Sequence, residues 1–235
     1  LSLTDDKVGL NRSDYHIDII VDKTERTITV RDNGIGMSAE EAESNLGVIA
    51  KSGSYKFKQE VGDDTKDTDV IGQFGVGFYS AFMVADHITV ISKKYGEEQA
   101  YRWESSGADG YTITECDKEA VGTDVIMHIK PDFDEEIYGT FLETWKLKAL
   151  VKKYSDYIRY PIRMEVEKSR KKEDSPEDKP EYESYTEMET LNSMVPIWQK
   201  NKKDVTEEEY DAFYRDKFYD YNKPLRVIHF SAEGQ

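Results

Sequence analysis

Two glycine clusters constrain this chain most, because each leads into a predicted helix, the first from a predicted strand and the second from a polar, acidic stretch. They are DNGIGM at residues 32–37 and GQFGVGF at residues 72–78. Glycine permits positive φ and close approach of a ligand, and a glycine loop that leads into a helix directs free N–H groups at an anion. Both clusters therefore indicate ligand-binding turns, although either one alone is also typical of an ordinary turn. Neither matches G-x-G-x-x-G or G-x-x-x-x-G-K-[ST], so Rossmann and P-loop sites are not supported.

The residues around these clusters predict one sheet with interspersed helices. Residues 16–30 are rich in β-branched side chains around a polar turn, which predicts a hairpin that brings Asp32 to the end of a strand. Ser38 and Glu41 have the spacing of a capping box, which predicts a helix from Ala39 to about Ala50. Further strands are predicted at HITVISKK, YRWES, YTIT and DVIMHIK, and further helices at YSAFMVA and at residues 141–158.

The composition along the chain changes once, and the change predicts two domains. Residues 168–190 are mostly charged, contain two prolines and offer little to bury, which is typical of a linker. Residues 1–167 are then an N-terminal domain. Residues 191–235, with a second capping box at Thr206 and Glu209 and several aromatic side chains expected in a core, are the beginning of another α/β domain. Because the chain begins without Met and ends just after the strand-like LRVIHF, we expect an excerpt of a longer protein.

Charge and composition exclude several classes of function. The 32 Lys and Arg residues against 48 Asp and Glu residues give a formal net charge of −16, which argues against binding nucleic acid or an anionic membrane by bulk electrostatics. Neither a membrane-spanning apolar stretch nor a leader is evident, so a cytoplasmic protein is expected. The single cysteine, Cys116, suits a reducing compartment. The four histidines are far apart in the sequence and lack metal-binding motifs, so no metal site is expected.

Two side chains near the glycine clusters have the chemistry of nucleotide ligands. Asp32 stands at a strand end, where a carboxylate can accept a hydrogen bond from an exocyclic amine such as that of adenine. Lys51, at the end of the first predicted helix, is placed to reach a phosphate. Each also has an ordinary interpretation, since an aspartate caps turns and a lysine stabilises a helix C-terminus. Their combination carries more weight than either residue alone.

Together these motifs resemble the heat shock protein 90 chaperone family, most closely its bacterial HtpG members, within the GHKL ATPase superfamily. The segments that carry the resemblance stand in the family's order over essentially the whole chain: DNGIGM, NLGVIAKSG, IGQFGVGFYSAFMVAD, RWES, GTDVIMHI, KYSDYIRYPI, PIWQKNKKDVTEEEYDAFY and HFSAEGQ. The resemblance implies an α/β two-layer sandwich of the GHKL (Bergerat) type, in which helices cover one face of a mixed sheet, followed by the start of a second α/β domain.

The resemblance also implies roles for individual residues. Asp32 would bind the adenine amino group, with Gly36, Met37 and Thr123 completing the base pocket. The sugar and phosphates would be surrounded by Asn45, Lys51 and the backbone of Gln73, Phe74, Gly75, Val76, Gly77 and Phe78. The segment from about Gly47 to Val76 would be the family's mobile lid.

At the level of function, the resemblance implies an ATP-dependent molecular chaperone that clamps client proteins and assists their folding. The intact protein would act as a homodimer with ATP and Mg²⁺, and without nucleic acid or membrane. In the family, a helix before the hairpin supplies a glutamate that activates water and an asparagine that holds Mg²⁺. Residues 1–15 contain neither that helix nor any glutamate. We therefore expect no catalytic or metal-binding residue in this chain, and no ATP hydrolysis by this chain alone.

Two alternatives remain open at this point. One is another GHKL ATPase, of the MutL or topoisomerase type, which the acidic charge and the segments AKSG and FGVGFYSAFMVAD disfavour. The other is a non-catalytic protein-interaction module in which both glycine clusters are only turns. A titration with an adenine nucleotide separates this module from both ATPases.

Overall fold

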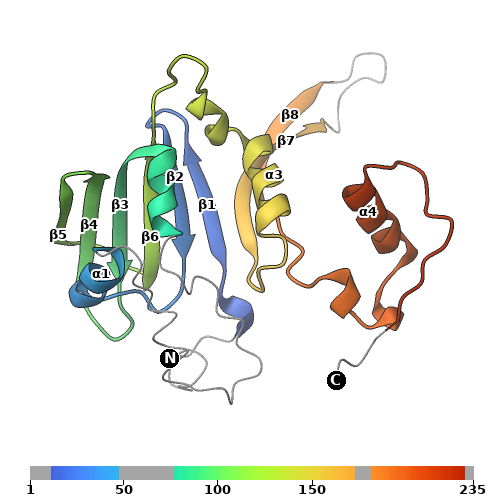
Figure 1. The fold of residues 1–235 in the computed structure, drawn as a ribbon, viewed down its shortest axis with the longest axis horizontal. Helices are drawn as coiled ribbons and strands as arrows, with labels where there is room; N and C mark the ends of the chain where they lie inside the picture. Colours follow the sequence, from blue (N-terminus) through green and yellow to red (C-terminus); the bar gives the residue numbers. More distant parts are fainter. Residues whose placement is uncertain (1–11, 48–76, 173–180, 231–235) are drawn as a thin grey trace.

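The computed structural model describes residues 12–47, 77–172 and 181–230 of the chain. Within these residues eight strands form one sheet in the order β5-β4-β3-β6-β2-β1-β7-β8, and α1, η3 and α3 lie on one of its faces (Figure 1). The strands are β1 (Ile17–Asp22), β2 (Thr27–Asp32), β3 (Ala85–Lys93), β4 (Ala100–Gly107), β5 (Gly110–Cys116), β6 (Gly122–Ile129), β7 (Ile162–Lys171) and β8 (Tyr182–Thr190). The helices are α1 (Ala39–Leu46), α3 (Thr144–Tyr154) and α4 (Glu207–Phe218), with 3₁₀ turns η2 (Arg12–Asp14), η3 (Phe78–Met83), η4 (Tyr138–Leu142), η5 (Ile197–Gln199) and η6 (Lys202–Asp204).

The pairing of the strands makes the sheet mixed. β1 and β2 form the predicted antiparallel hairpin, in register from Ile17 opposite Asp32 to Asp22 opposite Thr27. β2 continues antiparallel to β6, and β6 to β3, whereas β1 is parallel to β7. The expected α/β two-layer arrangement, with a mixed sheet covered on one face, is confirmed.

The core lies between the sheet and its helices in two adjoining clusters. One cluster packs α1 against the middle of β3 and β4, through Leu46, Ile88, Val90 and Trp103 among others. The other packs α3 against β1, β2, β6 and β7. Alternation along each strand sends every second side chain to the opposite face, where ion pairs such as Arg163 with Asp18 occur. The apolar face of the sheet is therefore the one that the helices cover, and the face with the ion pairs is the other.

Both predicted capping boxes are confirmed, whereas two helix predictions need correction. Ser38 Oγ accepts from the Glu41 amide at 3.3 Å, and the Glu41 carboxylate accepts from the Ser38 amide at 2.9 Å. The helix predicted at 141–158 is shorter, because Glu143 is extended between η4 and α3 and because the helical backbone ends at Ser155. The YSAFMVA segment forms the 3₁₀ turn η3 and then enters β3. Residues 48–50 of the first predicted helix lie outside the described residues.

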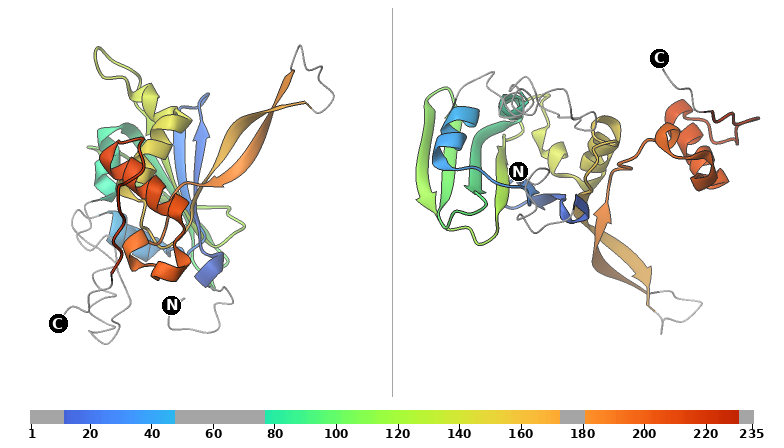
Figure 2. Two further views of the ribbon diagram at one scale, coloured as in Figure 1. Left: turned by 90° about the vertical axis from the view of Figure 1, so that its right-hand side faces the viewer. Right: turned by 90° about the horizontal axis from the view of Figure 1, so that it is seen from below.

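The predicted linker at 168–190 is wrong for its described residues, because they belong to the β7–β8 hairpin. Pairing runs from Arg163 opposite Thr190 to Lys171 opposite Tyr182. Charges that look merely solvated in the sequence pair across the strands, as between Arg170 and Glu183 at 2.7 Å. The far part of the hairpin projects away from the rest of the sheet (Figure 2). Division of the chain into domains at 168–190 stays a prediction.

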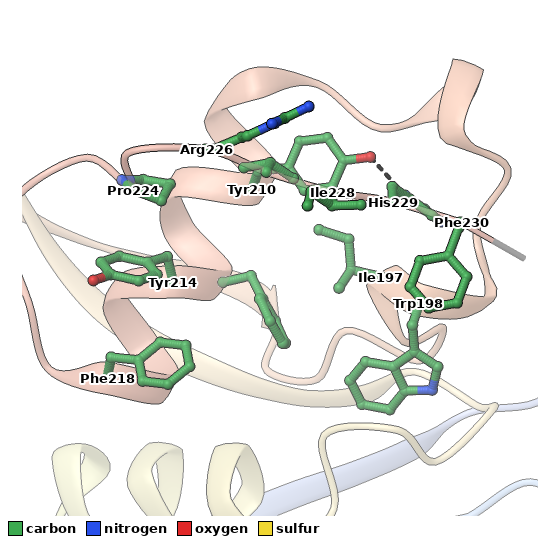
Figure 3. A pocket seen from close by; sticks show the side chains of 12 residues that line it. Ile197, Trp198, Tyr210, Tyr214, Phe218, Pro224, Arg226, Ile228, His229 and Phe230 are labelled. Carbon is green, nitrogen blue, oxygen red and sulfur yellow. Dashed lines mark hydrogen bonds between the residues drawn. The ribbon is translucent and has the colours of Figure 1, made fainter.

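After β8 the chain leaves the sheet and forms α4, which begins at the predicted capping box of Thr206 and Glu209. Aromatic side chains of α4 and of residues 224–230 line a pocket of about 540 Å³ (Figure 3). Across it the Tyr210 hydroxyl and His229 Nδ1 are 2.6 Å apart. Within the described residues Tyr210, Phe213 and Tyr214 are half-buried and Phe218 is exposed, so the expectation that these aromatics belong to a domain core stays a prediction.

Four further observations concern features that the sequence pointed to. His87 and His128, distant in sequence, are paired across β3 and β6 with ring centroids 5.2 Å apart. In the described parts of the chain, no group of three or more His, Cys, Asp or Glu side chains is arranged to hold a metal ion. Cys116 is a free thiol. No helix in those same parts has the length and apolar character needed to cross a membrane.

Candidate functional site

Asp32 is the last residue of β2, as predicted, and it lies opposite Thr123 of β6. Its Oδ1 accepts a hydrogen bond from the Gly34 amide at 2.8 Å. Burial raises the pKa of Asp32, and hydrogen bonds from the Gly34 and Thr123 backbone partly oppose this effect. The result is a half-buried carboxylate at a sheet end, with one oxygen held by its own turn.

Gly36 allows the turn after Asp32 to press against β3. Its φ is +64°, and a Cβ at this position would lie 1.9 Å from the Lys93 carbonyl oxygen. A hydrogen bond joins the same two segments, since the Tyr95 amide donates to the Ile35 carbonyl at 2.8 Å. Both the positive φ and the close approach therefore require glycine here. At Gly36 the close neighbour is β3, and the expectation that DNGIGM lets a ligand approach the backbone stays a prediction.

Met37 and Thr123 meet at a side chain that the sequence analysis did not single out, Ser92 of β3. The Met37 amide donates to Ser92 Oγ at 2.8 Å, and Ser92 Oγ lies 2.9 Å from Thr123 Oγ1. Ser92 is only 2% exposed and Thr123 8%. Alternation shows only that Ser92 shares a face of β3 with Ile88 and Val90; its contacts with Met37 and Thr123 leave no signal in the sequence of this strand.

The structure therefore brings together all four residues expected around the base. Asp32 and Thr123 are cross-strand partners, and neighbouring side chains in such a pair stand on the same face of the sheet. Gly36 and Met37 belong to the turn that covers the ends of these strands. These four residues therefore come from β2, from β6 and from the turn that follows β2.

The residues expected around sugar and phosphates are described only in part. Asn45 lies in the last turn of α1, and Gly77 precedes η3, in which Phe78 packs edge-on against Trp103 at 5.3 Å. The Tyr79 hydroxyl donates to the Leu46 carbonyl at 2.5 Å. The end of α1 and the start of η3 are thus adjacent. Lys51, Gln73, Phe74, Gly75, Val76 and the expected lid from 48 onward lie outside the described residues, so their roles stay predictions.

An ion-pair group lies on the opposite face of β2 and β6; its Asp124 and Lys118 side chains are nearly buried, whereas Arg31 is 48% exposed. Asp124 accepts two hydrogen bonds from Arg31, at 3.0 and 2.9 Å, and one from Lys118 at 2.8 Å. Burial alone would raise the pKa of Asp124, yet the hydrogen bonds from Arg31 and Lys118 hold it below its usual value. Because Arg31 and Asp124 are the register neighbours of Asp32 and Thr123, this group fixes the strands that carry the site.

These features define what the site can do chemically. A fixed carboxylate beside a fixed hydroxyl offers a hydrogen-bond acceptor and a hydroxyl to the edge of a heterocyclic base. Glycine turns let such a base approach the backbone. The arrangement fits the adenine group of a nucleotide, whereas the described residues offer no ready-made metal cluster.

Comparisons with known proteins concern the chain as a whole. The family model for histidine kinase-, DNA gyrase B- and HSP90-like ATPases matches residues 11–123, and the Hsp90 protein model matches residues 140–185 and 171–235. Chaperone protein HtpG of Clostridium botulinum (strain Langeland) is 53% identical over 234 residues, which are 99% of this chain and 37% of that protein. Chaperone protein HtpG of Clostridium perfringens (strain 13) gives the same identity and coverage.

The chain spans 37% of the length of these relatives. The two family models follow each other along it, one through Asp32 and Thr123 and the other through α4. The resemblance stated from the motifs is therefore confirmed. The chain belongs to the heat shock protein 90 family of ATPase chaperones.

Proposed function

We propose that this chain forms the adenine-binding part of the ATP site of a molecular chaperone. The observation that carries the proposal is the Asp32–Thr123 pair, a half-buried carboxylate and a buried threonine held side by side at the end of a sheet. Family membership supports it, since the model that spans these residues describes ATPases. In this proposal Asp32 accepts a hydrogen bond from the adenine amino group, and Gly36, Met37 and Thr123 enclose the base.

The nucleotide is ATP, carried with Mg²⁺ in the intact protein. Asn45, Lys51 and the backbone of residues 73–78 are proposed to surround the sugar and phosphates. We assign no general base and no metal ligand to this chain. The residues described at the site are proposed to bind and orient the adenine. Bound Mg²⁺ would neutralise phosphate charge, and we assign none of the residues described at the site to the hydrolysis step.

The intact protein is proposed to use ATP to clamp client proteins, as a homodimer in the cytoplasm. The curated relatives are described as chaperone proteins, which supports clients as partners. The net charge of −16 argues against nucleic acid and anionic membranes as partners. Neither alternative is favoured: the Hsp90 match from residue 140 onward weighs against MutL- or topoisomerase-type ATPases, and the ATPase match over 11–123 against a plain interaction module.

Calorimetric titration of the chain with ADP and, separately, GDP tests this proposal. We expect one ADP site per chain and at least tenfold weaker binding of GDP, because guanine presents an acceptor where adenine presents its amino group. A parallel phosphate-release assay with ATP should give background rates. Failure to bind ADP at millimolar concentration, or equal binding of both nucleotides, would contradict the proposal.

A further inference from the structure

We propose that the free edge of β5 binds an extended, basic polypeptide segment through backbone hydrogen bonds. The segment would lie beside residues 111–115 as an additional strand of the sheet. This inference rests on the proposed function in one respect, namely that client proteins are partners of the intact protein. It concerns a surface separate from Asp32, because β4, β3 and β6 stand between β5 and β2 in the sheet.

β5 is the last strand on one side of the sheet (Figure 1). One of its edges pairs with β4, from Ala100 opposite Cys116 to Glu104 opposite Thr112. Among the described residues, no strand pairs with its other edge. Alternate residues of an edge strand direct their N–H and C=O groups away from the sheet, where another strand can bind them. β5 therefore offers a row of backbone donors and acceptors to an extended partner.

The free edge of β5 lacks the features that usually protect an edge strand. Such strands are protected against pairing by charged side chains or by proline. β8, the strand at the opposite edge, carries three glutamates, Glu183, Glu187 and Glu189. Residues 111–114 of β5 include neither a charged residue nor a proline, and their Tyr, Thr and Ile side chains favour strands. The two edges of the sheet therefore differ, and β5 is the edge suited to a partner strand.

The core holds the edge of β5 in place. The Tyr111 ring stacks on Trp103, with ring centroids 5.8 Å apart and an interplanar angle of 21°. Trp103 is only 2% exposed, and Ile113 packs against the same core cluster. Because β5 is already ordered, the entropy lost on binding falls mainly on the incoming segment.

The charges around the end of β5 favour a basic segment. Exposed acidic side chains gather there: Glu98, Glu115, Asp117 and Glu119. Three of them line a cavity of about 460 Å³ at this end of the strand. Complementary charges steer two partners together and fix their register. A segment that carries Lys or Arg where it passes this cavity is therefore preferred over an acidic segment.

The lysines of the same cavity do not cancel its acidic charge. Lys118 is nearly buried and pairs with Asp124 at 2.8 Å. Lys93, whose ammonium donates to the Glu119 carbonyl at 3.4 Å, is then the one remaining cation beside three carboxylates. A second copy of this chain would bring a net charge of −16 and the same acidic residues to the edge, so it is not the expected occupant.

Binding is tested with a fluorescein-labelled peptide of about eight residues that alternates Val and Thr between terminal lysines. Fluorescence anisotropy with the full chain should show saturable binding. Replacing the lysines of the peptide with glutamates should weaken binding at least tenfold. N-methylation of its central residues keeps the charge and the side chains but removes the N–H groups, and should also weaken binding at least tenfold. Equal binding of the methylated and unmethylated peptides, or no binding of the lysine peptide at millimolar concentration, would overturn the inference.

Hydrogen exchange followed by NMR locates the bound peptide. The peptide should slow exchange at alternate amides of residues 111–115, because only the outward N–H groups gain a partner. The amides of β8 should exchange as before. Protection confined to β8, or an unchanged β5, would contradict pairing at this edge.

Glu115→Lys in the full chain places a lysine on the free edge, and Glu25→Lys in the β1–β2 turn is the matched control. Both native side chains are exposed, and both substitutions change the net charge equally. We expect Glu115→Lys to weaken binding of the lysine peptide at least tenfold and Glu25→Lys to stay within about threefold of the parent. Equal weakening in both variants would show bulk electrostatics only and overturn the inference.

Two controls on the same samples separate the remaining outcomes. Sedimentation velocity reports self-association: a parent dimer that Glu115→Lys dissociates would make a second copy the occupant and overturn the basic segment. Titration with ADP separates the two proposals. ADP binding without peptide binding refutes this inference alone, whereas failure to bind ADP refutes the proposed adenine site whatever the peptide does.

Discussion

Replacing Asp32 with Asn probes the site by a change of one group at nearly constant volume. Asp32 Oδ1 already accepts from the Gly34 amide at 2.8 Å. In Asp32→Asn the amide oxygen is needed for that bond, so the NH₂ group takes the position of the other carboxylate oxygen. It then meets the adenine amino group donor to donor. If the amide group is rotated by 180°, its NH₂ group faces the Gly34 amide, and the two donors then meet there instead.

The size of the effect follows from the bond that is lost. A hydrogen bond to an ionised group contributes about 1.5–3 kcal/mol, so ADP affinity should fall about 10- to 100-fold. The fold should not suffer, because burial raises the pKa of Asp32 and the ionised form therefore costs the folded state stability at neutral pH. We expect the melting temperature of the unliganded variant to stay the same or rise slightly.

Titration calorimetry with ADP at neutral pH is the assay, and Asp22→Asn is the matched control. Asp22 lies in the same hairpin at the far end, where its Oδ1 accepts from the turn amides of Thr24 and Glu25. Its substitution removes the same charge but should leave ADP affinity unchanged. Equal ADP affinity in Asp32→Asn and the parent would refute the reasoning.

Three other perturbations have expected outcomes that the structure fixes. Gly36→Ala should lower the free energy of unfolding by at least about 2 kcal/mol in urea titrations, whereas Gly96→Ala, also at positive φ but in open space, should cost only about 1 kcal/mol. Asp124→Asn should cost about 2 to 3 kcal/mol, chiefly by leaving the nearly buried Lys118 ammonium without a carboxylate, because the half-exposed Arg31 is hydrated instead. Because the pKa of Asp124 is lowered on folding, its contribution is present above the unfolded-state pKa and is lost as the pH falls; the variant should show a flatter stability profile in acid. Tyr79→Phe should cost about 1 kcal/mol and speed amide exchange near Leu46, and unchanged exchange there would contradict the contact.

The features predicted correctly from the sequence depend on local interactions. The hairpin at 16–30 needs only alternating β-branched residues and a polar turn, and each capping box links residues three positions apart. Asp32 follows from the same hairpin, because the register of β1 with β2 places it at the strand end. The resemblance to the family placed Asp32 and Thr123 around one base; the structure pairs them across β2 and β6, and their role at the base stays a prediction.

The features that the sequence did not reveal depend on distant partners. Residues 168–171 and 182–190 look like a solvated linker until their opposite charges face each other across β7 and β8. The contacts of Ser92 need the pairing of β3 with β6 and the docking of the turn at Met37. Neither contact leaves a periodic signal in its own segment. The start of the helix predicted at 141–158 is similar, because the apolar residues of the 3₁₀ turn η4 come directly before those of α3 and only Glu143 separates the two elements.

Amide NMR of the chain during titration with ADP tests the central claim most directly, because it locates the ligand as well as detecting it. The account predicts that the amides of Gly34, Gly36, Met37 and Thr123 shift together with one dissociation constant, while those of Thr24 and Glu25 at the far end of the hairpin do not. GDP at the same concentration should shift them less. Saturable shifts confined to any other part of the chain, with Gly34 and Thr123 unmoved, would contradict the claim that this site binds adenine.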